Sequence, residues 1–374
     1  MKPLYVSTIV AGLLCLNLGC PSKPAAESSP DRSVDPAPTV EADRAGQVQA
    51  DQVAEAIEAV AKTRRDGNGA VIEVDLRDAE VGDVIGKLPV LPKLRSLLLA
   101  GSDISDQDLA EVGKIQTLEN LDLRGCGIGD DGIAHLGGLK RLKAIKFSGK
   151  DGATTVTDAA MTTLGGIKTL KVIASDFLPI SDDGIAALGG LSELVELYLA
   201  GTRVTDQAAS TLAGFSALRK LRIASTAFGN DGLAKLSELS DVTELDLSEC
   251  QGIDNDALAT LGGFKQLAKL NLYSTSVGDG AWGQLSGAEQ LKWLNVDKTN
   301  VGDASLQELG QLTGLTFLHL GSTKVTDAGL PALAELAKLE KLIVTRTEVT
   351  QAGVDQLQPK LPECEIQLAY VPGK

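Results

Sequence analysis

Cysteine and histidine are the side chains of this sequence best suited to metal binding or nucleophilic catalysis, and both are scarce. Beyond Cys15 and Cys20 the chain holds only three cysteines and two histidines: Cys126, Cys250, Cys364, His135 and His319. No C-x-x-C, H-E-x-x-H, G-x-S-x-G or phosphate-binding glycine motif occurs. We therefore predict a protein that is not an enzyme and that carries no metal and no cofactor.

Aspartate recurs in one column that could be interpreted as a ladder of calcium ligands. Calcium requires six or more oxygen ligands, and the glycine-rich nonapeptide of calcium-binding solenoids is absent. Each of these aspartates precedes a short apolar segment typical of a helix, where a carboxylate accepts free backbone N–H groups and suits the helix dipole. We predict helix capping for Asp106, Asp130, Asp158, Asp182, Asp206, Asp279, Asp303 and Asp327.

These residues belong to a repeat with the pattern L-x-x-L-x-L-x-x-T-x-V-T-D-x-G-L. Its copies begin at Leu94, Leu118, Leu142, Leu170, Leu194, Leu218, Val242, Leu267, Leu291, Leu315 and Leu339, and a degenerate copy begins at Val71. The spacing is 24 residues apart from one step of 25 and one of 28. Within L-x-x-L-x-L, alternation directs the leucines inward and the residues between them outward along a short strand.

The pattern resembles the bacterial 24-residue class of leucine-rich repeats, from about residue 71 to residue 368. That resemblance implies an α/β fold, a right-handed horseshoe-shaped solenoid with a parallel concave sheet and short helices on the convex side. It implies little about function, because the family binds very different ligands. The small residue of the ninth position, threonine in most copies and cysteine at Cys126 and Cys250, should satisfy backbone groups at the turn or pack as a buried side chain.

Four ring-bearing side chains stand out among the outward positions: Tyr273, Trp293, Phe317 and His319, with Ile343 beside them. Phe147, Phe215, Phe228 and Phe264, in contrast, fall on inward positions of the repeat. Because exposed aromatic clusters mark interaction sites, we interpret the four as a ligand-binding patch.

Charges alternate at the third position of the repeat, which points outward, where Glu196, Lys220, Glu244 and Lys269 follow one another. Strands about 4.8 Å apart allow these side chains to pair among themselves, as Arg222 and Asp246 can in the fifth column. We interpret this region as a self-neutralised, solvated ladder.

The 28-residue step between Leu142 and Leu170 inserts the segment GKDGATT, which should form a loop at an edge of the solenoid. The loop is either a second contact site or an insertion that the fold merely tolerates. The low free-energy cost of a longer loop favours a tolerated insertion.

The N-terminus has the features of an export signal: Lys2, an apolar run from Leu4 to Leu16, and Gly19 before Cys20. It resembles a lipoprotein signal, which implies lipidation of Cys20; plain secretion is the alternative. The expected location is extracytoplasmic, at a bacterial membrane facing the periplasm or the cell surface.

The remaining boundaries follow from composition. We predict a signal peptide over residues 1–20, a disordered tether over 21–50, a capping helix over 51–70, repeats over 71–358 and a C-terminal cap over 359–374. The cap contains Leu361, Cys364 and Ile366 as a last partial strand. The capping helix should bury one face formed by Val53, Ile57, Val60 and Ala61.

The formal charge of -15 makes nucleic acid an improbable partner. We therefore expect a surface-tethered module that binds a protein partner on its concave face. A scaffold that binds carbohydrate or cell wall is the alternative, since Trp293 and Phe317 could also stack on sugars.

Overall fold

The computed structural model describes residues 39–369, with side chains from Gly46 onward. The signal peptide, Cys20 and the first part of the expected tether lie outside these residues. The chain forms two units, residues 1–45 and 46–374. The first contributes only the start of helix α1 to the description, and the second holds all the repeats.

One sheet of fourteen strands runs through the second unit in the order of the sequence. Its strands are β1 (Lys62–Arg65), β2 (Val71–Asp75), β3 (Ser96–Leu98), β4 (Asn120–Asp122), β5 (Ala144–Ser148), β6 (Val172–Asp176), β7 (Glu196–Tyr198), β8 (Lys220–Arg222), β9 (Glu244–Asp246), β10 (Lys269–Asn271), β11 (Trp293–Asn295), β12 (Phe317–His319), β13 (Lys341–Ile343) and β14 (Glu365–Gln367). Only the β1–β2 pair is antiparallel among these strands.

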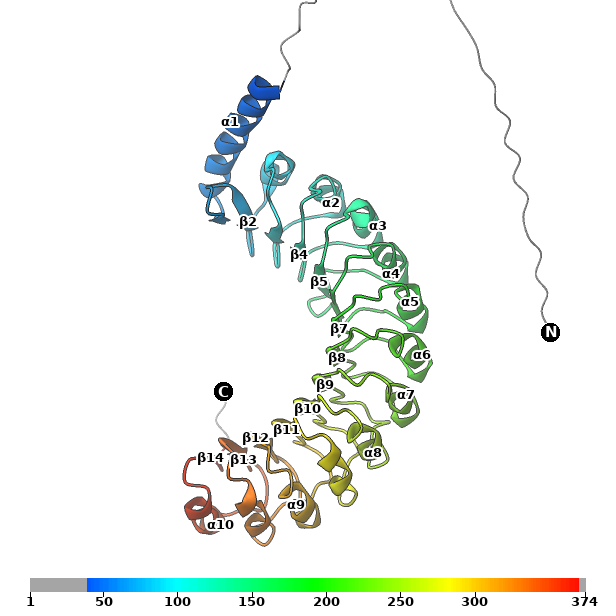
Figure 1. Ribbon diagram of the computed structural model, residues 1–374, viewed down its shortest axis with the longest axis vertical. Coiled ribbons are helices and arrows are strands. Elements are labelled where there is room, and N and C mark those ends of the chain that lie inside the picture. The colour runs from blue at the N-terminus through cyan, green and yellow to red at the C-terminus, as the bar shows by residue number, and fades with distance from the viewer. Residues whose placement is uncertain (1–38, 370–374) are drawn as a thin grey trace, which may run out of the picture. The chain divides into compact units, whose positions relative to one another are not determined.

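Short helices return the chain from the end of one strand to the start of the next. After α1 (Thr39–Glu58) come η1 (Gly82–Val90), α2 (Asp106–Val112), α3 (Asp130–Ala134), η2 (His135–Gly138), α4 (Asp158–Gly165), α5 (Asp182–Ala187), η3 (Asp206–Ala208), α6 (Ala209–Leu212), α7 (Asn230–Lys235), α8 (Ala257–Leu261), η4 (Trp282–Gly287), α9 (Asp303–Leu309), η5 (Leu330–Glu335), α10 (Gln351–Leu357) and η6 (Gln358–Lys360). Within residues 46–369 the strands line the inner side of an arc and the helices its outer side (Figure 1). The expected parallel concave sheet with outer helices is confirmed.

The core is a stack of nearly identical layers rather than one central cluster. Leu291, Leu294 and Val296 of a single repeat are at most 2% exposed, and Trp282 is fully buried on the helical side. Small hydroxyls close many of the layers: Thr299 Oγ1 donates to the Val296 carbonyl at 2.6 Å. The predicted role of this ninth position is thereby confirmed, and Cys126 Sγ fills the same column with a 3.0 Å contact to the Leu99 carbonyl.

The aspartate column binds the following repeat, which corrects the expectation that each aspartate caps its own helix. Asp182 lies at the start of α5, yet its carboxylate accepts the Thr205 N–H at 2.8 Å and the Thr205 hydroxyl at 2.7 Å. The helix is instead capped by the hydroxyl of the residue before the aspartate: Ser181 Oγ accepts the Asp183 N–H at the start of α5. All the predicted aspartates reach a backbone N–H of the next repeat at 2.7–2.8 Å, namely Asp106, Asp130, Asp158, Asp182, Asp206, Asp279, Asp303 and Asp327.

The aspartate column also explains why the T-D-x-G turn contains glycine. A side chain at Gly184 would overlap the Asp158 carboxylate of the repeat before it, and one at Gly353 would overlap that of Asp327. Glycine is required because the neighbouring carboxylate occupies the place of a Cβ atom. Thr350 donors hold the pKa of Asp327 below its usual value, so the carboxylate stays ionised at neutral pH.

The N-terminal boundary predicted from composition is wrong in two respects. Helix α1 begins at Thr39, inside the expected tether, because the prolines of that segment end at Pro38 and helix-forming residues follow. It also ends at Glu58, so Val60 is 60% exposed instead of buried, although Ile57 is buried as expected.

Residues 62–65, assigned by the sequence to the capping helix, instead form β1 along the free edge of β2. Arg64 pairs with Glu73 of β2 at 3.1 Å, which favours the extended conformation. The charged side chains Lys62, Arg64 and Arg65 thereby occupy the first edge of the sheet, where charge discourages further strand pairing.

At the other end, β14 pairs with β13, and Leu361 and Cys364 are buried, as expected of the C-terminal cap. The inserted segment forms the predicted loop between β5 and α4, with Thr154 Oγ1 donating to the Cys126 carbonyl at 2.9 Å.

The strand register predicts that inward and outward positions differ sharply in their effect on stability. Leu294→Ala should cost about 2 to 5 kcal/mol, because it creates a cavity in a closed layer. Asn295→Ala should cost about 1 kcal/mol, since it loses only the acceptor for the Asp297 N–H. Chemical denaturation measures both, and equal losses would contradict the register.

The hydrogen bonds of the aspartate column predict unequal roles for two adjacent aspartates at the start of α5. Asp182→Ala should lower the free energy of unfolding by about 1 to 3 kcal/mol, because the Thr205 N–H and hydroxyl lose their acceptor. Asp183→Ala, the matched control on an exposed residue, should cost under about 1 kcal/mol through the helix dipole alone. Urea titrations that rank the two in the opposite order would disprove the inter-repeat role.

Candidate functional site

Outward side chains of neighbouring strands align in rows across the concave face. Trp293 of β11 lies beside Phe317 of β12, and Asn295 lies beside His319. The next strand continues both rows with Lys341 and Ile343. The predicted columns are therefore confirmed, because parallel strands in register place equivalent positions about one strand spacing apart.

Trp293, Phe317 and His319 form one array of rings, which we call the aromatic surface. The Trp293 and Phe317 rings stack with centroids 4.9 Å apart and planes 6° from parallel. His319 meets Phe317 edge to face at 6.4 Å. The second face of Trp293 is covered by the Lys269 ammonium, 4.8 Å from the ring centroid. Both faces of the indole are thus occupied, and the ring presents its edge to a ligand.

Tyr273, the fourth side chain of the predicted patch, makes a contact of its own apart from the three stacked rings. It lies in the turn after β10, beyond the strand itself. Its ring packs against the Lys298 ammonium at 4.9 Å, and its hydroxyl oxygen accepts a hydrogen bond from the same group. Within the described part of the chain its aromatic contact is with Lys298 and not with the other three rings.

The surroundings of His319 favour the neutral form of its imidazole. Burial lowers the pKa of its imidazole, and the Asp297 carboxylate, 3.9 Å from Nε2, opposes this only in part. Asp297 Oδ1 is itself buried and has no hydrogen-bond partner among the described residues.

The charged ladder is neutralised only over part of its length. Lys220 contacts Glu244 at 3.0 Å and Glu196 at 3.6 Å, and these neighbours raise its pKa. Arg222 joins Asp176 at 2.9 Å and Asp246 at 3.2 Å. The expected pairing of Lys269 with Glu244 is wrong, because Lys269 turns to Trp293 instead.

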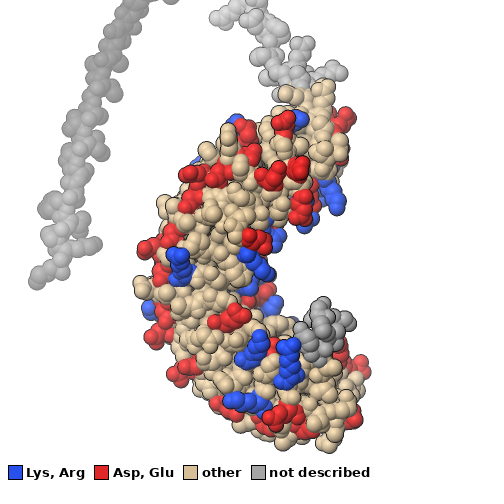
Figure 2. Space-filling model, turned by 180° about the vertical axis from the view of Figure 1, so that it is seen from behind, with Lys and Arg blue, Asp and Glu red and all other residues tan. Residues whose placement is uncertain are grey.

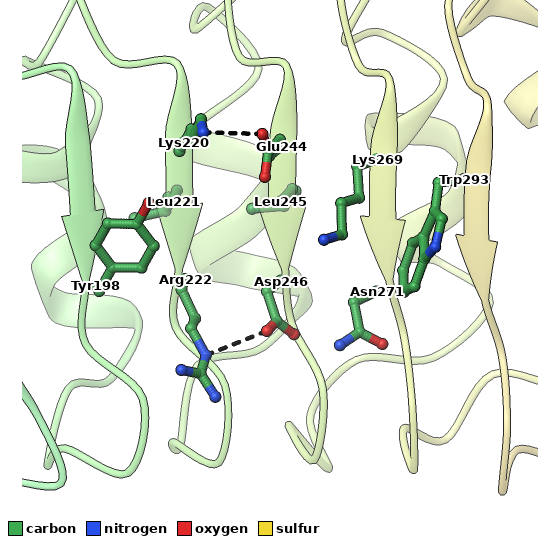
Figure 3. Close-up of a pocket in the computed structure, with 10 residues that line it drawn as sticks. All are labelled: Tyr198, Lys220, Leu221, Arg222, Glu244, Leu245, Asp246, Lys269, Asn271 and Trp293. Carbon is green, nitrogen blue, oxygen red and sulfur yellow. Dashed lines mark ion pairs between the residues drawn. The ribbon is translucent and has the colours of Figure 1, made fainter. Parts of the chain in front are cut away.

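A shallow cavity of about 230 Å³ lies between the ladder and the aromatic surface, and we call it the trough. Tyr198 stands at one end and Trp293 at the other, with strands β8, β9 and β10 between them (Figure 3). Its lining is Tyr198, Lys220, Leu221, Arg222, Glu244, Leu245, Asp246, Lys269, Asn271 and Trp293.

Tyr198 is the site residue that the sequence analysis did not single out. It occupies the outward fifth position of β7, in register with Arg222, so the repeat frame contained the signal. Its hydroxyl donates to Glu196 at 2.7 Å, and burial together with this bond raises its pKa above the usual value. The ring is therefore a fixed, neutral wall.

Other chemistry finds no support in the described residues 46–369. No group of three or more metal-ligating side chains occurs there. Cys126 and Cys250 are buried, and burial raises the pKa of both thiols, which makes them poor nucleophiles.

One short strand and one outer turn per repeat, stacked with a concave parallel sheet, define a leucine-rich-repeat solenoid. A family model described as Leucine Rich repeat matches residues 114–137 and 311–334. No curated protein matches the sequence.

Solved structures with the same fold come from several organisms. An internalin (inlF) of Listeria monocytogenes is 16% identical, with 87% of this chain and 95% of that chain covered at a TM-score of 0.62. A leucine-rich-repeat protein of Leptospira interrogans is also 16% identical, with 76% and 80% covered and a TM-score of 0.52. Mouse RP105, in a complex with MD-1, is 17% identical, with 79% and 50% covered and a TM-score of 0.60. At these identities the likeness concerns the fold. Solenoids of this kind are typically scaffolds for protein interaction, not enzymes.

Proposed function

We propose that this protein is a lipid-anchored, extracytoplasmic scaffold that binds a protein partner in the trough and on the adjoining aromatic surface. The observation that carries the proposal is the trough itself, a cavity on the concave face with an aromatic side chain at each end. Half-buried aromatic anchors beside paired polar groups are the composition of protein interfaces.

The aromatic surface favours a protein over a sugar. Carbohydrates stack their flat faces on free aromatic faces, whereas the faces of Trp293 are taken by Phe317 and Lys269. Ring edges beside ion pairs suit the irregular side chains of a polypeptide. Carbohydrate or cell-wall binding, the alternative from the sequence, is therefore kept as an outcome of the binding test below.

Anchoring rests on the N-terminal sequence, where Gly19 and Cys20 follow a short apolar run. No helix in the described part of the chain combines the length and apolar character that crossing a membrane requires. A lipid on Cys20 would supply an anchor without a spanning helix.

Trp293→Ala should weaken partner binding by about 2 kcal/mol or more, as the loss of a central aromatic anchor does. That corresponds to roughly thirtyfold in affinity. The full chain would be immobilised and exposed separately to envelope protein and to purified wall polysaccharide. The affinity of each variant for the captured ligand would then be measured.

The matched control is Trp282→Ala, which removes a fully buried ring whose Nε1–H donates to the Gly278 carbonyl. It should lower stability by about 3 to 5 kcal/mol and affect binding only through unfolding. Normal partner binding by a folded Trp293→Ala protein would contradict the proposal. The site would then move to the inserted loop, whose Gly149 lies against exposed Phe177.

Cys20→Ala should move the protein from the membrane fraction to the soluble extracytoplasmic fraction, because it removes the proposed lipidation site. Fractionation with and without detergent, followed by immunoblotting, measures the shift. Unchanged membrane association would argue for an uncleaved apolar segment as the anchor and against the lipoprotein assignment.

A further inference from the structure

Basic side chains gather in the trough, although the chain as a whole carries a formal charge of -15. Three basic side chains, Lys220, Arg222 and Lys269, line it together with two acidic ones, Glu244 and Asp246. Lys220 and Arg222 also contact Glu196 and Asp176, which lie outside the lining, so the region holds three basic and four acidic side chains. Figure 2 shows several basic side chains near the inner edge, where acidic ones lie among them, and acidic side chains along much of the outer margin.

Lys269 is the basic side chain of the trough that forms no ion pair with a described residue. Lys220 and Arg222 each contact two carboxylates. Lys269, in contrast, has no carboxylate within ion-pairing distance in the described part of the molecule. Its side chain is exposed on β10, and its ammonium lies over the Trp293 ring at 4.8 Å. The cation–π contact holds the ammonium in place without neutralising it.

A second donor, Asn271, lies two residues further along the same strand. Asn271 Oδ1 accepts the Tyr273 N–H at 3.2 Å, which leaves the side-chain N–H₂ as the free end of the amide. Both Asn271 and Lys269 line the trough beside Trp293 (Figure 3). Two donors beside an aromatic edge suit an oxygen acceptor, and the unpaired ammonium of Lys269 favours one that carries negative charge.

We infer that the trough recognises a carboxylate-bearing segment of the protein partner, with the acid bound by Lys269 and Asn271 and a neighbouring apolar side chain packed on the edge of Trp293. This inference deepens the proposed function and rests on it. The carboxylate of the partner supplies the ion pair that Lys269 lacks within the chain, so association gains a charge-assisted hydrogen bond.

The test uses the full chain and two pools of capped random hexapeptides that differ only in a fixed central residue, Glu in one and Gln in the other. The protein has two tryptophans, so its ¹⁵N spectrum contains two indole N–H signals, and Trp293→Phe assigns them. The Glu pool should shift the Trp293 signal and leave that of buried Trp282 in place. Its apparent affinity should exceed that of the Gln pool by about tenfold, the value of one net charged hydrogen bond.

Lys269→Gln should abolish the preference for Glu over Gln while both indole signals keep their folded positions. The matched control is Lys341→Gln, in the same column three strands away, where Lys341 already pairs with Glu365 at 2.9 Å outside the trough. It should leave the preference unchanged.

A preference retained in Lys269→Gln, or an equal response of Trp293 to both pools, would overturn the carboxylate inference while the proposed protein-binding role stood. Silence of Trp293 toward both pools would also overturn it. If a uronic-acid oligosaccharide then shifted the Trp293 signal, the proposed function would fall as well, because the anionic ligand would be a polysaccharide.

Discussion

The hydrogen bonds from each aspartate to the next repeat are the interaction on which the rest of the structure depends. A short strand of three residues and one turn of helix cannot bury an apolar face alone, so each repeat is stable only against its neighbours. The sheet joins repeats on the inner side, and the carboxylates join them on the outer side at 2.7–2.8 Å. Two lines of attachment fix both the spacing and the relative rotation of adjacent layers.

That double attachment turns a linear repeat into aligned rows of side chains. Residues about 24 positions apart meet across a strand spacing, which is why Trp293 stacks on Phe317 and Lys220 reaches Glu244. The concave face is therefore a grid with a constant backbone. Its chemistry depends on which residue occupies each point, and the same scaffold in other proteins with about 16% identity can present an unrelated surface.

The trough lies where two of these rows change character. On one side, alternating charges neutralise one another, and on the other side rings stack. Lys269 stands at the junction and contacts the ring instead of completing the charge alternation. The site thus lies at the boundary between the ion-paired side chains and the stacked rings, where one charge has no partner of opposite sign in the described chain.

The sequence by itself determined the repeat, the strand register and the inward or outward direction of each side chain, because alternation and spacing are properties of the backbone alone. It placed Leu294 in the core and Trp293, Phe317 and His319 on one face. Only the tertiary structure decided which of several equidistant neighbours each side chain contacts: the next helix for Asp182, Trp293 rather than Glu244 for Lys269, and Lys298 for Tyr273. The start of α1 at Thr39 also became clear only there, since composition averaged over the segment concealed where its prolines stop. Partner choice depends on side-chain conformation and packing between repeats, and a periodic pattern, which is the same for every neighbour, contains no information about it.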